Sequence, residues 1–234
     1  GVLLFCFLIS VGFRYQQFET WKQTPETYFV GERPMMSTLD APFYLRWARE
    51  YNEGTFGQKN FLGNYPANTE NIRDRSITKK FRDPQKISSA SSSSSQPSSS
   101  GTREINYLDL PLISSIIAFL APFFNYNYYL TGTLLIPVLA SLFILPLGIY
   151  FFRIGVPASG LIGGLIGTFS GAYYMRSSIG RIDTDMLNLF FPILTALLIL
   201  LASRAKRERS VLLYSAIAGL SLLMFNWWYS KAAF

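Results

Sequence analysis

Two acidic residues and two arginines lie in one short polar segment between stretches of apolar sequence. The segment reads Arg176-Ser-Ser-Ile-Gly-Arg-Ile-Asp-Thr-Asp-Met-Leu187 and includes Asp183 and Asp185. Unpaired charge is costly close to hydrocarbon, so carboxylates in such a place favour a functional role. Their oxygens are ligands suited to Mg²⁺ or Mn²⁺. We therefore predict an ion-binding loop at a membrane surface.

Helix capping is the alternative role for these carboxylates. Asp185 directly precedes the apolar stretch 186–202, where an acidic side chain satisfies free amides and suits the helix dipole. Residues two apart on a regular helix point to different sides. Asp183 and Asp185 can therefore share a cation only if Asp183 lies in the loop and Asp185 at the helix start, and Gly180 gives the backbone freedom for that fold. On this segment alone, capping and metal binding stay equally open.

Arg176 adds a permanent charge beside the acids. Its forked guanidinium can fix a carboxylate or a phosphate. The alternative is an arginine at the end of a membrane span, with its head group reaching for water.

A second acidic element lies nearer the N-terminus. Asp40 is followed by Ala-Pro, and Arg46 stands one turn before Glu50, which together predict a helix starting near Asp40. Taken alone, Asp40 fits a helix cap better than a metal ligand. If its segment and the loop at 176–185 share one side of a membrane, however, Asp40, Asp183 and Asp185 can converge on one ion.

Composition indicates a multi-pass membrane protein. Half of the 234 residues are hydrophobic, and they are gathered into runs without amphipathic spacing. A spanning helix needs roughly 20 apolar residues. Four runs approach or exceed that length, at about 128–152, 155–175, 186–202 and 210–228. The predicted fold class is therefore an all-α bundle of transmembrane helices.

The first apolar run, 1–13, is too short to cross a bilayer. We interpret it as the truncated end of a first transmembrane helix, since no small-residue cleavage site of a signal peptide follows before Arg14. The sequence also stops directly after the last span. We therefore expect a fragment of a larger protein.

Charge predicts the orientation. The loop from Arg204 to Arg209 is short and strongly basic, which places it in the cytoplasm. Counting back one span puts the loop at 176–185 outside, and one span earlier Arg153 lies inside. The segment 14–127 is then a long external loop on the same side as Asp183.

If the external loop contained a span of its own, the residues before that span would lie in the cytoplasm. The apolar segment 108–124 is therefore predicted to be an interfacial or re-entrant helix, as its length and its aromatic residues suggest. The stretch 88–100 is almost pure serine, which predicts a flexible linker.

Several classes of chemistry are excluded within this sequence. Histidine is absent and Cys6 is the single cysteine, so zinc sites, structural disulfides, cysteine nucleophiles and His-dependent triads cannot form. The net charge of +7 follows the predicted topology and forms no basic stripe, so we predict no nucleic-acid partner. Carboxylates, arginine, tyrosine and a hard cation remain.

The acidic motifs stand in a recognisable order with other short motifs. These are Met35-Met36-Ser37-Thr38-x-Asp40, Arg176 seven residues before Asp183, Gly180, Asp183-Thr-Asp-Met-Leu187 and Trp227-Trp228-Tyr229. Together they resemble the N-terminal membrane half of single-subunit bacterial oligosaccharyltransferases, over almost the whole chain. The resemblance implies a bundle of the GT-C type in the cell (inner) membrane, with its active face outside the cytoplasm.

The resemblance also implies a role for each matching residue. Asp40 matches an aspartate that contacts both the metal and the acceptor asparagine amide, and Asp183 and Asp185 match the motif that holds the metal. Arg176 matches an arginine that steadies the cluster, so the implied catalytic residues are Asp40, Asp183 and Arg176. Tyr229 looks like the tyrosine that meets the donor pyrophosphate, although Trp-Trp-Tyr is also typical of an interfacial aromatic belt.

The implied reaction is metal-dependent, with Mn²⁺ or Mg²⁺. It transfers an oligosaccharide from a polyprenyl-pyrophosphate carrier to the asparagine of an Asn-x-Ser/Thr sequon, so the implied partners are this lipid-linked donor, an acceptor polypeptide and membrane lipids. The family also has a later catalytic glutamate and a Trp-Trp-Asp domain, which this sequence does not contain. We expect the fragment alone to be inactive.

Two alternatives remain. One is another polyprenyl-phosphate-dependent glycosyltransferase, which would lack Asp-Thr-Asp-Met with an arginine seven residues before it. The other is a cation-coupled transporter, which predicts acids near mid-membrane on broken helices. The predicted spans contain essentially no buried charge.

Overall fold

A computed structural model describes residues 1–56 and 110–229 of the chain. Its elements, in chain order, are α1 (Val2–Gln23), α2 (Pro25–Tyr28), β1 (Phe29–Val30), β2 (Arg33–Pro34), α3 (Ala41–Asn52), α6 (Leu112–Leu120), η2 (Ala121–Phe124), α7 (Tyr128–Ser141), α8 (Ile144–Arg153), α9 (Pro157–Phe169), α10 (Gly171–Arg176), η3 (Thr184–Leu187), α11 (Phe190–Arg204) and α12 (Glu208–Tyr229). The predicted serine linker at 88–100 lies outside the described residues.

The predicted all-α membrane fold is confirmed. Among the described residues, three helical segments are long and apolar enough to cross a membrane, namely Tyr128–Arg153, Thr184–Arg204 and Glu208–Tyr229. The strands β1 and β2 form only a two-residue antiparallel hairpin, with Phe29 opposite Pro34. Large apolar side chains of α12 are exposed, as expected of a surface that faces lipid; they include Leu212, Leu213, Leu220 and Leu223.

The helix at the N-terminus does not end at residue 13. Helix α1 continues without interruption to Gln23, so residues 14–23 are helical and belong to α1. Arg14 is the reason for the error, because a charged residue usually marks the end of an apolar span. Here Arg14 is fully buried and packs into the bundle, which also corrects the expectation that the bundle holds essentially no buried charge.

The predicted span at 155–175 is not one helix. It consists of α9 and α10, separated at Ser170, whose ψ of 124° is not helical. Four glycines in α9 weaken its intrinsic helix preference, and Gly171 follows the break directly. Helix α9 alone, with 13 residues, is shorter than a spanning helix.

The other predicted spans agree closely with the structure. The segment predicted at 128–152 runs from Tyr128 to Arg153 as α7 and α8, with a break at Leu142 and Phe143. Pro146 explains this break, because it has no N–H with which to continue a helix from α7. The segment predicted at 108–124 contains the short helices α6 and η2, while 108–109 lie outside the described residues.

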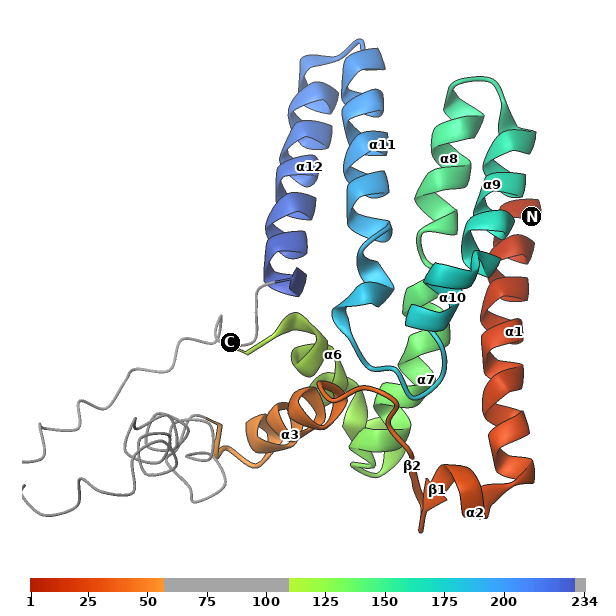
Figure 1. Cartoon of the computed structure of the whole chain (residues 1–234). Coiled ribbons are helices and arrows are strands. Elements are labelled where there is room, and N and C mark those ends of the chain that lie inside the picture. The colour runs from red at the N-terminus through yellow and green to blue at the C-terminus, as the bar shows by residue number, and fades with distance from the viewer. Residues whose placement is uncertain (57–109, 230–234) are drawn as a thin grey trace, which may run out of the picture.

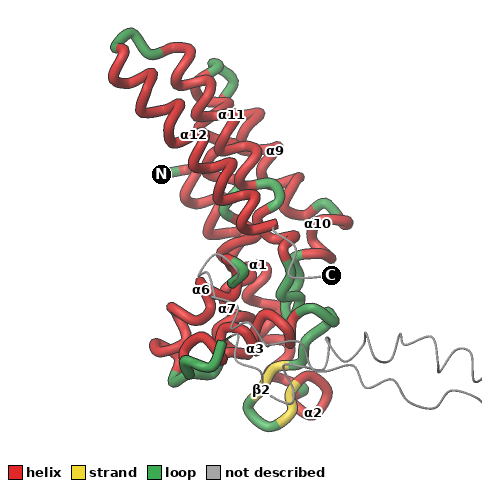
Figure 2. Tube along the Cα trace, turned by 90° about the vertical axis from the view of Figure 1, so that its left-hand side faces the viewer, coloured by secondary structure: helices red, strands yellow, loops and turns green. Residues whose placement is uncertain are grey.

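The bundle has two distinct ends (Figures 1 and 2). One end holds the turns between α8 and α9 and between α11 and α12, where the Arg204 guanidinium donates to the carbonyl of Arg153. The opposite end holds α3, α6, the hairpin and the loop from α10 to α11. The two basic turns thus share one end and the acidic segments share the other, as the charge pattern predicts.

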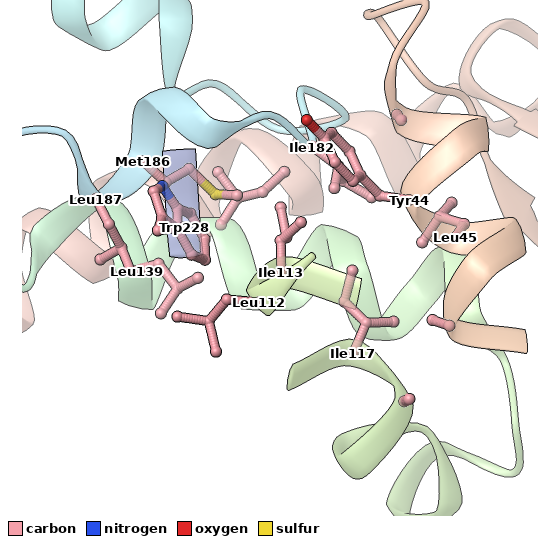
Figure 3. Close-up of a cluster of buried hydrophobic side chains, with 14 of the residues drawn as sticks. Tyr44, Leu45, Leu112, Ile113, Ile117, Leu139, Ile182, Met186, Leu187 and Trp228 are labelled. Carbon is pink, nitrogen blue, oxygen red and sulfur yellow. The ribbon is translucent and has the colours of Figure 1, made fainter. Parts of the chain in front are cut away.

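A hydrophobic core joins the elements at the acidic end (Figure 3). It contains buried side chains from α3, α6, α7, η3, α12 and the loop before η3, among them Leu45, Ile113, Ile117, Ile182, Met186 and Trp228. Gly132 of α7 lets Ile182 and Leu45 approach closely, since an added Cβ would lie 2.5 Å from Ile182 and 3.0 Å from Leu45. Because distant segments share this core, they hold a fixed position relative to one another.

Gly180 is the point where α1 and the segment before α3 meet the loop after α10. Its φ is +79°, and an added Cβ would lie 2.6 Å from the ring of Trp21 and 2.7 Å from the carbonyl oxygen of Met35. Its own carbonyl accepts a hydrogen bond from the Ser37 N–H at 2.9 Å. Only glycine combines this left-handed backbone with so close an approach.

We predict that Gly180→Ala destabilises the protein by about 2 kcal/mol or more, because alanine is strained at this φ and its methyl group would collide with the backbone of Met35. Gly219→Ala is the matched control, since an added Cβ there has open space within helix α12. The control should unfold at an unchanged or slightly higher temperature. Thermal unfolding in detergent measures both, and equal melting temperatures for the two variants would contradict the packing at Gly180.

Candidate functional site

Two hydrogen bonds fasten the segment before Asp40 to the loop that contains Asp183. The Ser37 N–H donates to the Gly180 carbonyl at 2.9 Å, and the Thr38 Oγ1 donates to the Ile182 carbonyl at 3.3 Å. The two segments are 144 residues apart in sequence at the second contact. Asp40 and Asp183 therefore follow directly after points of mutual contact and lie at the same end of the bundle.

Asp40 occupies the N-cap position of α3, as the sequence predicts. Its backbone carbonyl accepts from the N–H groups of Phe43 and Tyr44, at 3.0 and 3.2 Å. Its carboxylate, however, makes no capping hydrogen bond. The helix is secured by backbone geometry and by Pro42 in its first turn, so the carboxylate has no structural duty at this helix end.

Asp183 and Asp185 take the arrangement that sharing a cation requires. Asp183 is extended, with φ of −151° and ψ of 166°, while Asp185 lies in the first turn of η3. Oδ1 of Asp183 accepts from the Thr184 N–H at 2.6 Å, so this carboxylate does cap η3. Its second oxygen takes no part in that cap.

Arg176 pairs with Asp185. Its Nη1 donates to Oδ2 of Asp185 at 3.2 Å, and Asn188 donates to Oδ1 of the same carboxylate at 3.1 Å. The side chain of Arg176 is 63% exposed, against 18% for Asp185. The guanidinium therefore presents most of its surface outward, while the carboxylate that anchors it is held from two sides.

Negative charge accumulates around Asp183. Partial burial raises the pKa of its carboxyl above the ordinary 3.8, and the negative charges of Asp185 and Asp40 raise it further. The hydrogen bond from Thr184 and the charge of Arg181 oppose this rise. Three carboxylates that repel one another in this way form a region that favours a bound cation.

Tyr44 is a site residue that the sequence analysis missed. It lies one turn after Asp40 on α3, it is buried, and its side chain points toward the Ile182 loop (Figure 3). Burial raises the pKa of its phenol to about 12, with further contributions from Asp183, Asp40 and Asp185. The spacing of four residues from Asp40 was the available signal, because it places both residues on one helix face.

The donor groups fit Mg²⁺ or Mn²⁺ in chemistry, since all three are carboxylates. Within residues 1–56 and 110–229, however, no three acidic, histidine or cysteine side chains stand close enough together to hold a metal ion. Asp185 is turned toward Arg176 and Asn188. The structure thus gathers the three acids at one end without assembling them into a finished ligand set.

The Trp-Trp-Tyr motif ends α12 beside this loop. Trp228 is fully buried, and its Nε1 donates to the Thr184 carbonyl at 2.6 Å, between the two aspartates of the motif. Nε1 of Trp227 donates to the Leu110 carbonyl at 2.8 Å. The aromatic-belt interpretation is therefore wrong for Trp228, which braces η3, whereas Tyr229 is 54% exposed.

A groove of about 1010 Å³ lies along α3. It starts at Pro42, two residues after Asp40, and is bounded by the hairpin and by the residues that precede α7. Its lining includes Arg33, Arg46, Arg49, Asn52, Tyr126, Asn127 and Tyr129. Arg46 is paired with Glu50 at 2.6 Å, and Arg33 stacks on the ring of Tyr129.

The raised pKa of Asp183 makes stability depend on pH. The folded protein binds this proton more tightly than the unfolded chain does, so stability falls as pH rises from 3.8 through the raised folded pKa. Asp183→Asn removes this dependence and keeps an oxygen that can accept from Thr184. We predict that the variant melts above the wild type at neutral pH, and that this advantage shrinks in acid.

Glu26→Gln is the matched control, because it removes one negative charge from an exposed position in α2. Melting temperatures measured across the acidic to neutral range decide the matter. An Asp183→Asn variant that is less stable than the wild type at neutral pH would show that the carboxylate is not under electrostatic strain.

Comparison with known proteins identifies the family of this chain. A family model described as oligosaccharyl transferase STT3, N-terminal, matches residues 105–232, which include the loop with Asp183 and Asp185 and the whole of α11 and α12. No curated protein matches the chain. The match covers more than half of the sequence, and the chain belongs to the STT3 oligosaccharyl transferase family.

Proposed function

We propose that this chain forms the acceptor-facing and metal-binding part of a membrane oligosaccharyltransferase. The enzyme transfers a glycan from a polyprenyl-pyrophosphate carrier to the asparagine of an Asn-x-Ser/Thr sequon. The observation that carries the proposal is the contact of Ser37 and Thr38 with the loop at 180–182, which brings Asp40 to the acidic motif of the family-matched segment. Family membership itself implies a glycosyltransferase.

The acceptor nitrogen is the chemical difficulty in this reaction. An amide nitrogen is a poor nucleophile because its lone pair is delocalised into the carbonyl. A carboxylate that accepts hydrogen bonds from the amide N–H groups weakens that delocalisation in the transition state. Asp40 suits this role, because its carboxylate caps no helix amide, and Asp183 has one oxygen outside its cap.

Asp40, Asp183 and Asp185 are the residues that would hold Mg²⁺ or Mn²⁺. A divalent cation supplies stabilisation of the negative charge that develops on the departing pyrophosphate. Closing the three carboxylates into a ligand set would also relieve the repulsion that raises the pKa of Asp183. Asp185 would retain Arg176 as its hydrogen-bond donor, an arrangement that orients metal-binding carboxylates in other sites.

Other residues suit the donor. Arg176 exposes much of its guanidinium and can bind a phosphate oxygen in a bidentate manner. Tyr229 is exposed at the same end of the bundle, one residue after the tryptophan that braces η3, and we propose that it contacts the pyrophosphate. The groove along α3 offers room beside Asp40 for polar parts of a bulky substrate.

The arrangement relative to a membrane follows from the substrates. The polyprenyl chain remains in the bilayer, so the reacting phosphate must lie at the ends of the spanning helices. The acidic segments occupy one end, and the basic turns at Arg153 and Arg204 the other. We propose that the acidic end lies outside the cytoplasm of a cell (inner) membrane.

The test uses membranes with the full-length protein, a lipid-pyrophosphate-linked oligosaccharide and a sequon peptide. Asp40→Asn and Asp183→Asn should each lower the transfer rate by about 100-fold or more, because each removes a carboxylate charge from the proposed reaction site. Glu26→Gln should transfer at the wild-type rate. Chelation followed by addition of Mn²⁺ should abolish and restore wild-type transfer.

Two results would count against the proposal. Full transfer by both aspartate variants would remove the acids from the reaction. Preference for a lipid-monophosphate-linked sugar as donor would favour another polyprenyl-phosphate-dependent glycosyltransferase.

A further inference from the structure

Arg14 is a fully buried arginine inside the helical bundle. Its Nη1 donates to Ser10 at 2.8 Å and to the hydroxyl of Thr168 at 3.1 Å. Its Nη2 donates to the carbonyl of Thr168 at 3.1 Å and to the hydroxyl of Ser177 at 3.0 Å. One side chain of α1 therefore binds the last turn of α9 and the residue directly after α10.

No carboxylate pairs with Arg14 among the residues that the structure describes. Three other groups compensate its charge. The Thr168 carbonyl belongs to the C-terminal turn of α9, where the helix dipole favours a cation. Hydroxyls of Ser10 and Ser177 accept from it, and the rings of Tyr173 and Tyr174 lie 5.8 and 5.4 Å from its Cζ.

The bonds of Arg14 bridge the break at Ser170. Thr168 lies before the break and Ser177 beyond it, so the guanidinium fixes the end of α9 relative to the end of α10. Burying a charge without an acidic partner is costly, and Nε of Arg14 has no hydrogen-bond partner. An apolar residue would fill the space at lower cost, which indicates that the cation is retained for what it orients.

The contacts lead from Arg14 to the acidic motif. Ser177 donates to the carbonyl of Tyr173 at 2.7 Å. The Tyr173 hydroxyl lies 2.9 Å from the carbonyl of Ala140 and 3.0 Å from that of Met186, and so joins α10 to both α7 and η3. Met186 immediately follows Asp185.

Helix α1 supports the same loop at two further points. The Gln17 side chain accepts from the Ile179 N–H at 3.0 Å, and Trp21 packs against Gly180. Arg14, Gln17 and Trp21 follow one another at helical spacing along one side of α1. Residues on successive turns of α1 thus contact positions 177, 179 and 180 of the loop.

We propose that Arg14 is a positioning residue that holds the loop at 177–187 in the geometry its acids need. The inference rests on the proposed function for its effect on transfer, but its effect on the loop can be measured independently. Arg14 touches neither acid and acts through Ser177 and Tyr173. Its planar fork is essential, because Nη2 binds Thr168 and Ser177 on the two sides of the break while Nη1 binds Ser10 and Thr168, a set of contacts that a lysine ammonium cannot reproduce.

The experiment compares Arg14→Lys, Arg14→Met and Ser177→Ala with the wild type in full-length protein. Gln16→Ala is the matched control on the exposed side of α1. Hydrogen–deuterium exchange reports on the loop amides, including those of Ile179 and Thr184, and on residues 205–212 at the opposite end. Transfer rates are measured on the same samples and normalised to the folded fraction.

We expect Arg14→Lys and Ser177→Ala to remain folded and to exchange the amides at 178–184 at least about tenfold faster, with unchanged exchange at 205–212. Their kcat should fall by about 10- to 100-fold with KM little changed, because acids displaced by a fraction of an ångström lose the reacting geometry. Gln16→Ala should match the wild type in both measurements.

The outcomes separate the two proposals. Unchanged loop exchange in Arg14→Lys and Ser177→Ala would overturn the role of Arg14, whatever the transfer rates. Equally faster exchange at both ends would mean that Arg14 stabilises the fold in general, and would also overturn its positioning role. Loop-specific exchange in a protein whose wild type transfers no glycan would uphold the positioning role and refute the proposed function. If Arg14→Met does not fold, the other two variants still decide.

Discussion

The contact between Gly180 and the segment that precedes α3 is the constraint on which the rest of the site depends. A left-handed glycine lies between the ring of Trp21 and the backbone of Met35, and its carbonyl accepts from Ser37. This contact unites three parts of the chain that are far apart in sequence. Together with the Thr38–Ile182 hydrogen bond and the shared core, it relates Asp40 at the start of α3 to Asp183 before η3.

Rigid packing keeps the two acidic segments in contact although their carboxylates repel one another. The pKa of Asp183 is raised mainly because the carboxyl is partly buried, and further because the carboxylates of Asp185 and Asp40 repel its charge. The core around Ile182, Met186 and Trp228 resists the movement that would relieve the repulsion. The repulsion thus lowers the free energy of unfolding, and binding of a cation or a substrate amide would raise it again. Functional sites commonly lower stability in this way.

The sequence predicts the features that depend on local pattern. Apolar runs give α11 and α12 within a few residues, Asp40 starts α3 as its neighbours Ala41 and Pro42 indicate, and basic turns gather at the end opposite the acids. The contact of the segment before α3 with the loop after α10 also agrees with the expectation that both lie at one end of the bundle. These features follow from helix propensity, from charge and from the alternation of loops between the two sides of a membrane. Such properties can be read from neighbouring residues or from the order of the spans.

Features that depend on tertiary contact were not predictable. Arg14 resembled the end of a span, because nothing near it in sequence reveals that Thr168 and Ser177 will compensate its charge. The break at Ser170 was missed for the same reason, since Arg14 of α1 holds both of its sides. Trp228 resembled an interfacial aromatic, but its partner is the carbonyl of Thr184, 44 residues away.

The most direct test of the account is a distance measurement between nitroxide labels on the segment before α3 and on the acidic loop. With Cys6 replaced, labels at Leu39→Cys, an exposed position, and at Asp183→Cys should show strong dipolar broadening in electron paramagnetic resonance spectra. Labels at Leu39→Cys and Lys206→Cys, at opposite ends of the bundle, should show none. Unbroadened spectra from the first pair would mean that the two acidic segments do not meet, and the account would fail.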